Sequence, residues 1–196
     1  MTVGSVPAYK EQPRSGIVPA METQRTEEPE AAGERVVAHE AGGPVDDQRA
    51  MDEHFLAIAI EQARMGGLEG GVPIGAALVA DGKVLGTGHN RRVQLGSPIR
   101  HGETDALEAA GRLDASVYRR ATMYTTLSPC DMCTGAILLY GIPRVVLGEN
   151  ETFVGGEDLL RSRGVEVVDM ASEECEQLMR DFIAAHPEIW FEDIGE

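Results

Sequence analysis

The segments His101-Gly102-Glu103 and Pro129-Cys130-Asp131-Met132-Cys133 carry the most information about the fold and chemistry of this chain. The two cysteines are three positions apart, so on a helix both sulfurs point the same way. The proline before them stands where helices commonly begin, which places the thiols at a helix N-terminus, where the dipole favours thiolate over thiol. A catalytic zinc takes three such nitrogen or sulfur ligands and keeps a fourth position for water. The sequence therefore predicts a zinc site made of His101, Cys130 and Cys133.

Glu103 is the candidate catalytic residue. Two thiolates already cancel the zinc charge, so this zinc should acidify its water less than a zinc held by three neutral imidazoles, whose water has a pKa of about 7. A nearby base is then useful. In the first turn of a helix, Glu103 could reach the water without binding the metal, accept its proton and pass it on to the substrate.

Two other interpretations of these segments stay open. A structural zinc site usually has four protein ligands, and the chain offers few candidates for the fourth, since Cys175 is the only other cysteine. The C-x-x-C segment could also occur by chance without a metal, although the histidine, glutamate and proline all fall into place. We expect Cys175 to be an ordinary thiol on a helix.

The charge of the chain bears on its partners. The net charge is −16, and the residues after position 50 include 12 basic and 24 acidic side chains. Nucleic-acid binders usually carry a basic patch, so we expect a small neutral substrate and no nucleic acid, unless a basic groove is formed locally. No apolar run approaches the roughly 20 residues of a membrane span. The N-terminus has no apolar signal region, and the cysteine usage fits a reducing cytoplasm.

The chain divides into two parts. Residues 1–48 hold half of the ten prolines, many glutamates and one aromatic residue, Tyr9, without an apolar period. They are interpreted as a disordered N-terminal tail, followed by one domain over residues 49–196.

Within the domain, apolar periodicity and turn residues predict alternating helices and strands. The expected helices span residues 47–65, 102–113, 130–140, 158–163 and 172–185. The expected strands span residues 74–80, 83–88, 121–127, 143–148 and 165–168, with a tight turn at Asp81-Gly82 between the first two. This order predicts an α/β fold with three α-β-α layers around a central mixed five-stranded sheet.

From about Met51 to Glu196 the chain resembles the fungal-type cytosine deaminases, a branch of the cytidine deaminase superfamily. The H-x-E and P-C-x-x-C elements are common to that superfamily. Narrower markers are the segments Glu69–Gly75, Gly88-His89-Asn90, Tyr124–Gly135 (YTTLSPCDMCTG), Tyr140–Arg144, Gly148-Glu149-Asn150 and Trp190–Glu196 (WFEDIGE).

The resemblance implies a cytidine deaminase-like fold, Zn²⁺ as cofactor, and a role for further residues. Asn90 and the Gly102 backbone N–H would bind the carbonyl of the base, and Asp193 would accept the ring N1–H. A carboxylate there would favour a free base, because a nucleoside carries its sugar on N1. The resemblance also implies a pocket wall, made of Phe153 and Trp190 as an aromatic lid with Ile74, Leu127 and Ser128 beside the ligand.

Each of these residues also has an ordinary structural interpretation. Asn90 could cap a loop, Asp193 could be a solvated residue, and Phe153, Trp190 and Ile74 could simply pack. The chain departs from the family pattern at Thr104-Asp105, where an apolar and then a small polar residue are expected, and Asp105 adds a charge close to the metal helix.

These observations favour zinc-dependent hydrolytic deamination of a free pyrimidine base, cytosine to uracil and ammonia. The alternatives are a deaminase of another aminated ring (guanine, isocytosine or a nucleoside), a tRNA or single-stranded DNA editor, and a silent zinc-binding scaffold. The apolar run Ala136–Tyr140 has more apolar faces than one small sheet can cover, so we also expect a homodimer.

Overall fold

The computed structural model describes residues 44–196. These residues form eight helices, which are α1 (Pro44–Leu68), α2 (Arg92–Leu95), α3 (Gly102–Ala110), α4 (Ala115–Tyr118), α5 (Asp131–Tyr140), α6 (Glu157–Ser162), α7 (Glu173–Ala185) and α8 (Pro187–Ile194). The five strands are β1 (Gly75–Ala80), β2 (Lys83–His89), β3 (Ala121–Leu127), β4 (Arg144–Glu149) and β5 (Glu166–Asp169).

The strands form one sheet in the order β2-β1-β3-β4-β5. β1 runs antiparallel to both β2 and β3, whereas the pairs β3–β4 and β4–β5 are parallel. The Asp81-Gly82 turn joins β1 to β2 with positive φ at both residues (52° and 71°), as a two-residue hairpin of this type requires. The expected mixed five-stranded sheet is confirmed.

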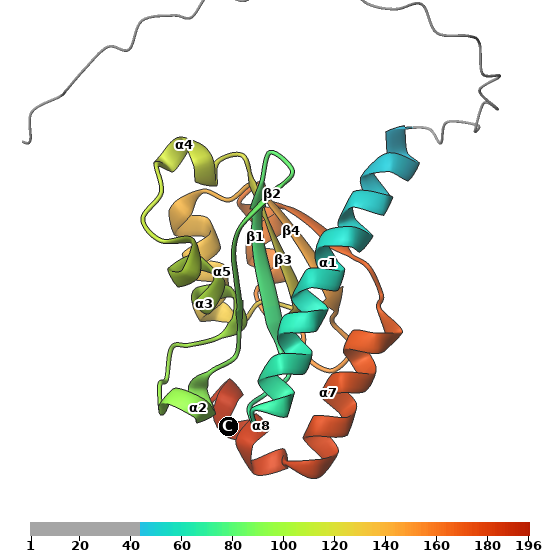
Figure 1. The fold of residues 1–196 in the computed structure, drawn as a ribbon, viewed down its shortest axis with the longest axis vertical. Coiled ribbons are helices and arrows are strands. Elements are labelled where there is room, and N and C mark those ends of the chain that lie inside the picture. Colours follow the sequence, from blue (N-terminus) through green and yellow to red (C-terminus); the bar gives the residue numbers. More distant parts are fainter. Residues whose placement is uncertain (1–43) are drawn as a thin grey trace, which may run out of the picture. The chain divides into compact units, whose positions relative to one another are not determined.

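Helices cover both faces of this sheet (Figure 1). One apolar cluster joins the sheet to α3 and α5 through residues such as Met123 and Ile137, and a second joins the opposite face to α1 and α7 through Tyr124 and Cys175. Met123 and Tyr124 are neighbours in β3 and serve opposite clusters, because successive strand residues point to opposite faces. The three-layer α-β-α architecture is therefore confirmed.

The structure differs from the sequence-based expectation in its short helices. α2, α4 and α8 were not predicted, because four to eight residues give too little periodicity to be recognised. α3 ends at Ala110 rather than at 113, since Gly111 takes a positive φ of 72°. Cys130 is the N-cap of α5 rather than its first helical residue.

The predicted tail, residues 1–48, lies outside the described residues except for positions 44–48, which form the beginning of α1. Among the helices of residues 44–196, none is long and apolar enough to cross a membrane.

Candidate zinc and base-binding site

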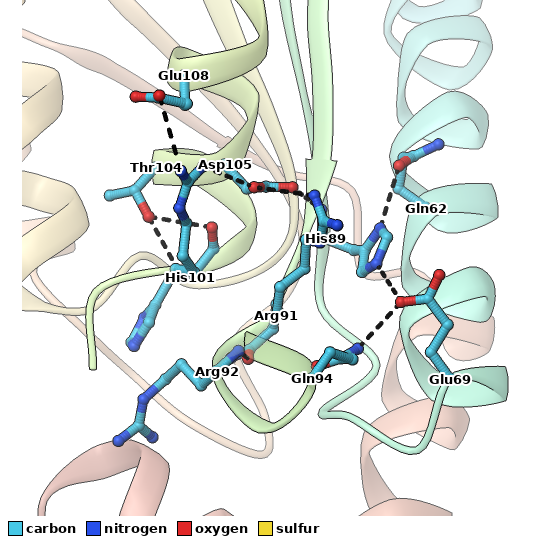
Figure 2. Close-up of polar contacts among 12 residues, drawn as sticks. Gln62, Glu69, His89, Arg91, Arg92, Gln94, His101, Thr104, Asp105 and Glu108 are labelled. Atoms are coloured by element: carbon cyan, nitrogen blue, oxygen red, sulfur yellow. Dashed lines mark hydrogen bonds and ion pairs between the residues drawn. The ribbon is translucent and has the colours of Figure 1, made fainter. Parts of the chain in front are cut away.

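Two helix N-termini bring the proposed zinc ligands together. His101 is the N-cap of α3, where its backbone N–H donates to Thr104 Oγ1 at 2.9 Å (Figure 2). Cys130 is the N-cap of α5 and Cys133 lies in its first turn. The candidate ligand atoms of the three residues all lie within 4.8 Å of one another, and Cys130 Sγ is 3.4 Å from His101 Nδ1. Ligands of a tetrahedral zinc with bonds of about 2.0–2.3 Å lie roughly 3.3–3.8 Å apart, so the donor set fits that ion.

The electrostatics of the cluster fit a divalent cation as well. Hydrogen bonds from Cys133 and His101 outweigh burial and lower the pKa of Cys130 to about 4. The pKa of Cys133 is raised, because its contact with the Cys130 sulfur and its burial disfavour a second thiolate beside Glu103. Burial would lower the pKa of His101, but its contact with Cys130 and the charge of Asp193 raise it. Without a metal the cluster therefore retains protons, which a bound cation would displace.

Glu103 lies at the bottom of the site with only 3% of its surface exposed. Its Oε2 accepts a hydrogen bond from Cys133 Sγ at 3.3 Å. Burial and the Cys130 thiolate both raise the pKa of Glu103 above its ordinary value. A carboxyl group that binds protons more strongly near neutral pH is suited to accept a proton and release it again.

A small cavity opens over these residues and brings together nine of the twelve residues predicted for the site. It is lined by Ile74, His101, Glu103, Leu127, Ser128, Cys130, Phe153, Trp190 and Asp193, with Ile194 added. Gly102, Cys133 and Asn90 do not line it, but the first is the residue after His101, the second is a ligand candidate beneath the cavity, and Asn90 contacts Asp193.

Asn90 and Asp193 are 103 positions apart and bonded to each other. Asn90 is fully buried, and its Nδ2 donates to Asp193 Oδ1 at 2.8 Å. The Asn90 backbone N–H donates to the Ile74 carbonyl at 2.8 Å, which fixes the residue at the end of β2. The Asp193 carboxylate thus lines the cavity, and the Asn90 amide is hydrogen-bonded to it.

Arg92 is a further residue beside Asp193, and the sequence analysis did not predict it. Its Nη1 donates to Asp193 Oδ1 at 2.9 Å and its Nη2 to Glu192 at 2.6 Å, while its backbone N–H donates to Asn90 Oδ1 at 3.1 Å. The guanidinium therefore neutralises Asp193 and ties α8 to the segment that carries Asn90. One arginine in a polar loop gives no sequence pattern by which this role could have been found.

The lid over the cavity is held by a second polar group. Phe153 and Trp190 pack edge to face, with ring centroids 5.8 Å apart. The loop that carries Phe153 is anchored by Ser128, whose Oγ donates to the buried Glu157 at 2.8 Å and accepts from the Gly155 N–H at 3.0 Å. Ser128 thus supports the lid in addition to lining the cavity, and Glu157 is a further residue that sequence reasoning missed.

A His-Cys-Cys donor set with a buried carboxylate beside a small cavity fits a catalytic zinc site. The chain belongs to the deaminase family described as the cytidine and deoxycytidylate deaminase zinc-binding region, whose family model matches residues 49–149. Zn²⁺ is therefore the cofactor that both the family and the geometry indicate.

Two relatives show how the similarity is distributed. The chain is 55% identical over 146 residues to a cytosine deaminase of Candida albicans, covering 74% of this chain and 97% of that protein. It is 35% identical over 109 residues to a tRNA-specific adenosine deaminase of Streptococcus pyogenes, covering 55% of this chain and 68% of the relative.

Solved structures agree on the fold. A structure from a study of tRNA:A34 deaminases superposes with a TM-score of 0.55 at 29% identity, covering 64% of this chain and 99% of the other. A guanine deaminase from Nitrosomonas europaea gives a TM-score of 0.59 at 21% identity, covering 78% of this chain and all of that one. The expected cytidine deaminase-like fold is confirmed.

Proposed function

We propose that the protein removes the exocyclic amine of free cytosine by hydrolysis, giving uracil and ammonia. The observation that carries the proposal is the Asp193 carboxylate at the cavity wall, hydrogen-bonded to Asn90. A carboxylate facing the N1 position of a pyrimidine accepts its N–H and leaves no room for a ribose. The high identity to a cytosine deaminase along almost the whole length of that relative supports the same substrate.

In this proposal each residue of the site has one task. Zinc held by His101, Cys130 and Cys133 would acidify a water molecule and so supply the nucleophile. Glu103 would accept one proton of the attacking water and donate it to the ring nitrogen next to the reacting carbon. It would then take the second proton from the hydroxyl formed on that carbon and donate it to the amine, which leaves as ammonia.

The remaining residues bind and orient the base. Asn90 Nδ2 and the Gly102 N–H donate to its carbonyl, and Asp193 accepts from N1–H. Ile74 and Leu127 form apolar walls, while Phe153 and Trp190 cover the ring and exclude bulk water. Because the two polar side chains already contact each other, little reorganisation is needed to receive the base.

Other substrates are the nearest rivals. Guanine and isocytosine also carry a ring N–H beside an amidine, so Asp193 does not reject them, whereas a nucleoside lacks that proton. An RNA or DNA editor is disfavoured by the acidic domain. A silent zinc scaffold would have no use for the buried Glu103.

The test is ammonia release by zinc-loaded protein from cytosine, cytidine, guanine and isocytosine. We expect turnover of cytosine and none of cytidine. Equal turnover of cytosine and cytidine would contradict the role of Asp193, and turnover of guanine or isocytosine alone would replace the substrate while keeping the reaction.

We also propose that the protein is a cytoplasmic homodimer that salvages pyrimidine rings. Its α5 helix leaves Leu139 79% exposed and Tyr140 42% exposed. An open groove beside them is lined by further apolar residues of α3, α4 and α5. Burying such a surface against a second copy would remove apolar area from water.

A further inference from the structure

The two ends of the segment between Asn90 and His101 are joined by a backbone hydrogen bond. Arg91 follows Asn90, Arg100 precedes His101, and the Arg91 N–H donates to the Arg100 carbonyl at 2.8 Å. Asn90, assigned to the base carbonyl, and His101, assigned to zinc, therefore directly flank the two residues joined by this hydrogen bond. We call the pair Arg91 and Arg100 the neck of the segment, and any shift of the neck moves both Asn90 and His101.

The guanidinium groups of both neck arginines contact one carboxylate, that of Asp105. Arg100 Nη1 lies 3.1 Å and Arg91 Nη1 lies 3.8 Å from Asp105 Oδ1. The second oxygen, Oδ2, accepts the backbone N–H of His89 at 3.4 Å, one residue before Asn90 (Figure 2). Only 8% of the Asp105 side chain is exposed, so these contacts are poorly screened by solvent.

The other side of the neck is held by α1. The ring of His89 points away from Asp105, with Nε2 3.0 Å from Glu69 and Nδ1 3.3 Å from Gln62 (Figure 2). Asn90 thus follows a residue held on two sides, by Gln62 of α1 with Glu69 just after that helix, and by Asp105 of α3. Asp105 also lies in the same helix as Glu103, two positions after it.

We propose that Asp105 is a positioning residue that couples Asn90 to the zinc-binding end of α3. This inference rests on the proposed function for the role of Asn90, and it goes beyond it by assigning a task to a charged residue where the family pattern led us to expect a small polar one. Asp105 does not touch the base. It acts by fixing the distance between the group that binds the base carbonyl and the groups that hold the metal and move the proton.

Removing this carboxylate should impair catalysis through Asn90. We expect Asp105→Ala to lower kcat/KM for cytosine about tenfold or more, because small displacements of binding groups are costly in rate. Asp105→Asn keeps an acceptor for the His89 N–H but loses the charge, so its effect should be intermediate. In an Asn90→Ala background, Asp105→Ala should add little, since the group that it positions is gone.

A matched control separates positioning from lost stability. Asp52 in α1 is also buried and paired with an arginine, Arg144, which begins β4 at the end of the sheet opposite the site. Asp52→Asn should lower the melting temperature and leave kcat/KM unchanged. Zinc content, measured by chelation after unfolding, should remain at one per chain in every variant.

A readout that needs no turnover completes the experiment. The side-chain amide signals of Asn90 in a ¹H–¹⁵N spectrum should shift in Asp105→Ala and stay in place in Asp52→Asn. Additive losses in the double variant, or an unshifted Asn90 signal, would overturn the coupling. If the wild-type protein released no ammonia from cytosine, the proposed function would fail, while the amide signals would still decide whether Asp105 positions Asn90.

Discussion

At the scale of single residues, Glu103 is buried and yet must exchange protons. The carboxyl is almost fully buried, beside two sulfurs, and its raised pKa follows from burial and from the Cys130 thiolate. Such a group is costly to place in a core and is useful only where protons must be exchanged. Its position one residue beyond Gly102, in the first turn of α3, keeps it close to the metal ligands without making it one.

We expect Glu103→Gln to reduce kcat by about 10² to 10⁴, the usual contribution of a positioned acid–base group. The amide has nearly the same shape, so zinc content should not change. The measurement is ammonia release together with metal analysis of the same preparation. Turnover within a factor of three of the wild type would show that another group moves the protons.

The candidate zinc ligands and Glu103 could be predicted from the sequence because each of their two segments is local and the combination of the two segments is a superfamily pattern. The i, i+3 spacing of Cys130 and Cys133 needs only one helical turn to bring both sulfurs together. The pair of Asn90 and Asp193 is different, since 103 positions separate them and only the resemblance indicated it. Arg92 and Glu157 escaped prediction altogether, because their roles depend on which distant carboxylate or hydroxyl the fold places beside them.

At the scale of elements, the loop between β4 and α6 depends on the close approach of its backbone to the carbonyl of Pro129. Gly156 N–H donates to the Pro129 carbonyl at 2.8 Å, and a Cβ on Gly155 would lie 2.0 Å from that carbonyl oxygen. Pro129 directly precedes Cys130, a candidate zinc ligand, so the loop that carries Phe153 is held against the candidate metal site. Side-chain chemistry alone does not reveal this constraint.

Gly155→Ala should therefore push the loop away from Pro129, raise KM for the base several-fold and destabilise the protein by about 1–3 kcal/mol, as overpacking does. Gly67→Ala is the control. It lies in α1, where a Cβ meets its nearest neighbour at an ordinary 3.4 Å and alanine favours the helix. Steady-state kinetics and urea unfolding of both variants check this, and unchanged KM in Gly155→Ala would refute the argument.

The sheet and the long helices were predictable for a related reason. Strands with apolar runs and a helix such as α7, with its regular apolar face, carry a period that extends over many residues. The short elements α2, α4 and α8 carry none. α8 matters most, because it presents both Trp190 and Asp193, and Trp190 packs in one cluster with Met179 and Phe182 of α7.

At the scale of the whole molecule, the exposed face of α5 predicts association. Leu139→Glu would place a charge in the proposed interface, and we expect the dissociation constant of the dimer to rise at least about 100-fold, so that a wild-type dimer becomes a monomer at micromolar protein. Leu68→Glu is the control, because Leu68 is 89% exposed at the end of α1. Sedimentation velocity decides, and a dimer that survives in Leu139→Glu would place the interface elsewhere.

The stability of the whole domain depends on an ion pair that ties α1 to the sheet. Arg144 Nη1 and Nη2 donate to the two oxygens of Asp52 at 2.7 and 2.8 Å, and Tyr124 donates to Oδ1 at 3.0 Å. Burial would raise the pKa of Asp52, but Arg144 and Tyr124 outweigh it, so the pKa is lowered. The stabilisation is therefore fully present above about pH 5, and is lost as the pH falls through the lowered folded-state value, below about 4.

We expect Asp52→Asn to lower the free energy of unfolding by about 3 kcal/mol at pH 7, the lower end for a broken buried pair, because Arg144 keeps its contact with Glu166 at 3.1 Å. The difference from the wild type should shrink as the pH falls below 4, since the carboxyl of the unfolded wild type then binds a proton more readily than that of the folded state, whose pKa is lowered. Urea unfolding at several pH values between 3 and 7 measures it. A difference that is constant over this range would mean that the charge of Asp52 does not stabilise the fold, and that packing of the side chain alone holds α1 on the sheet.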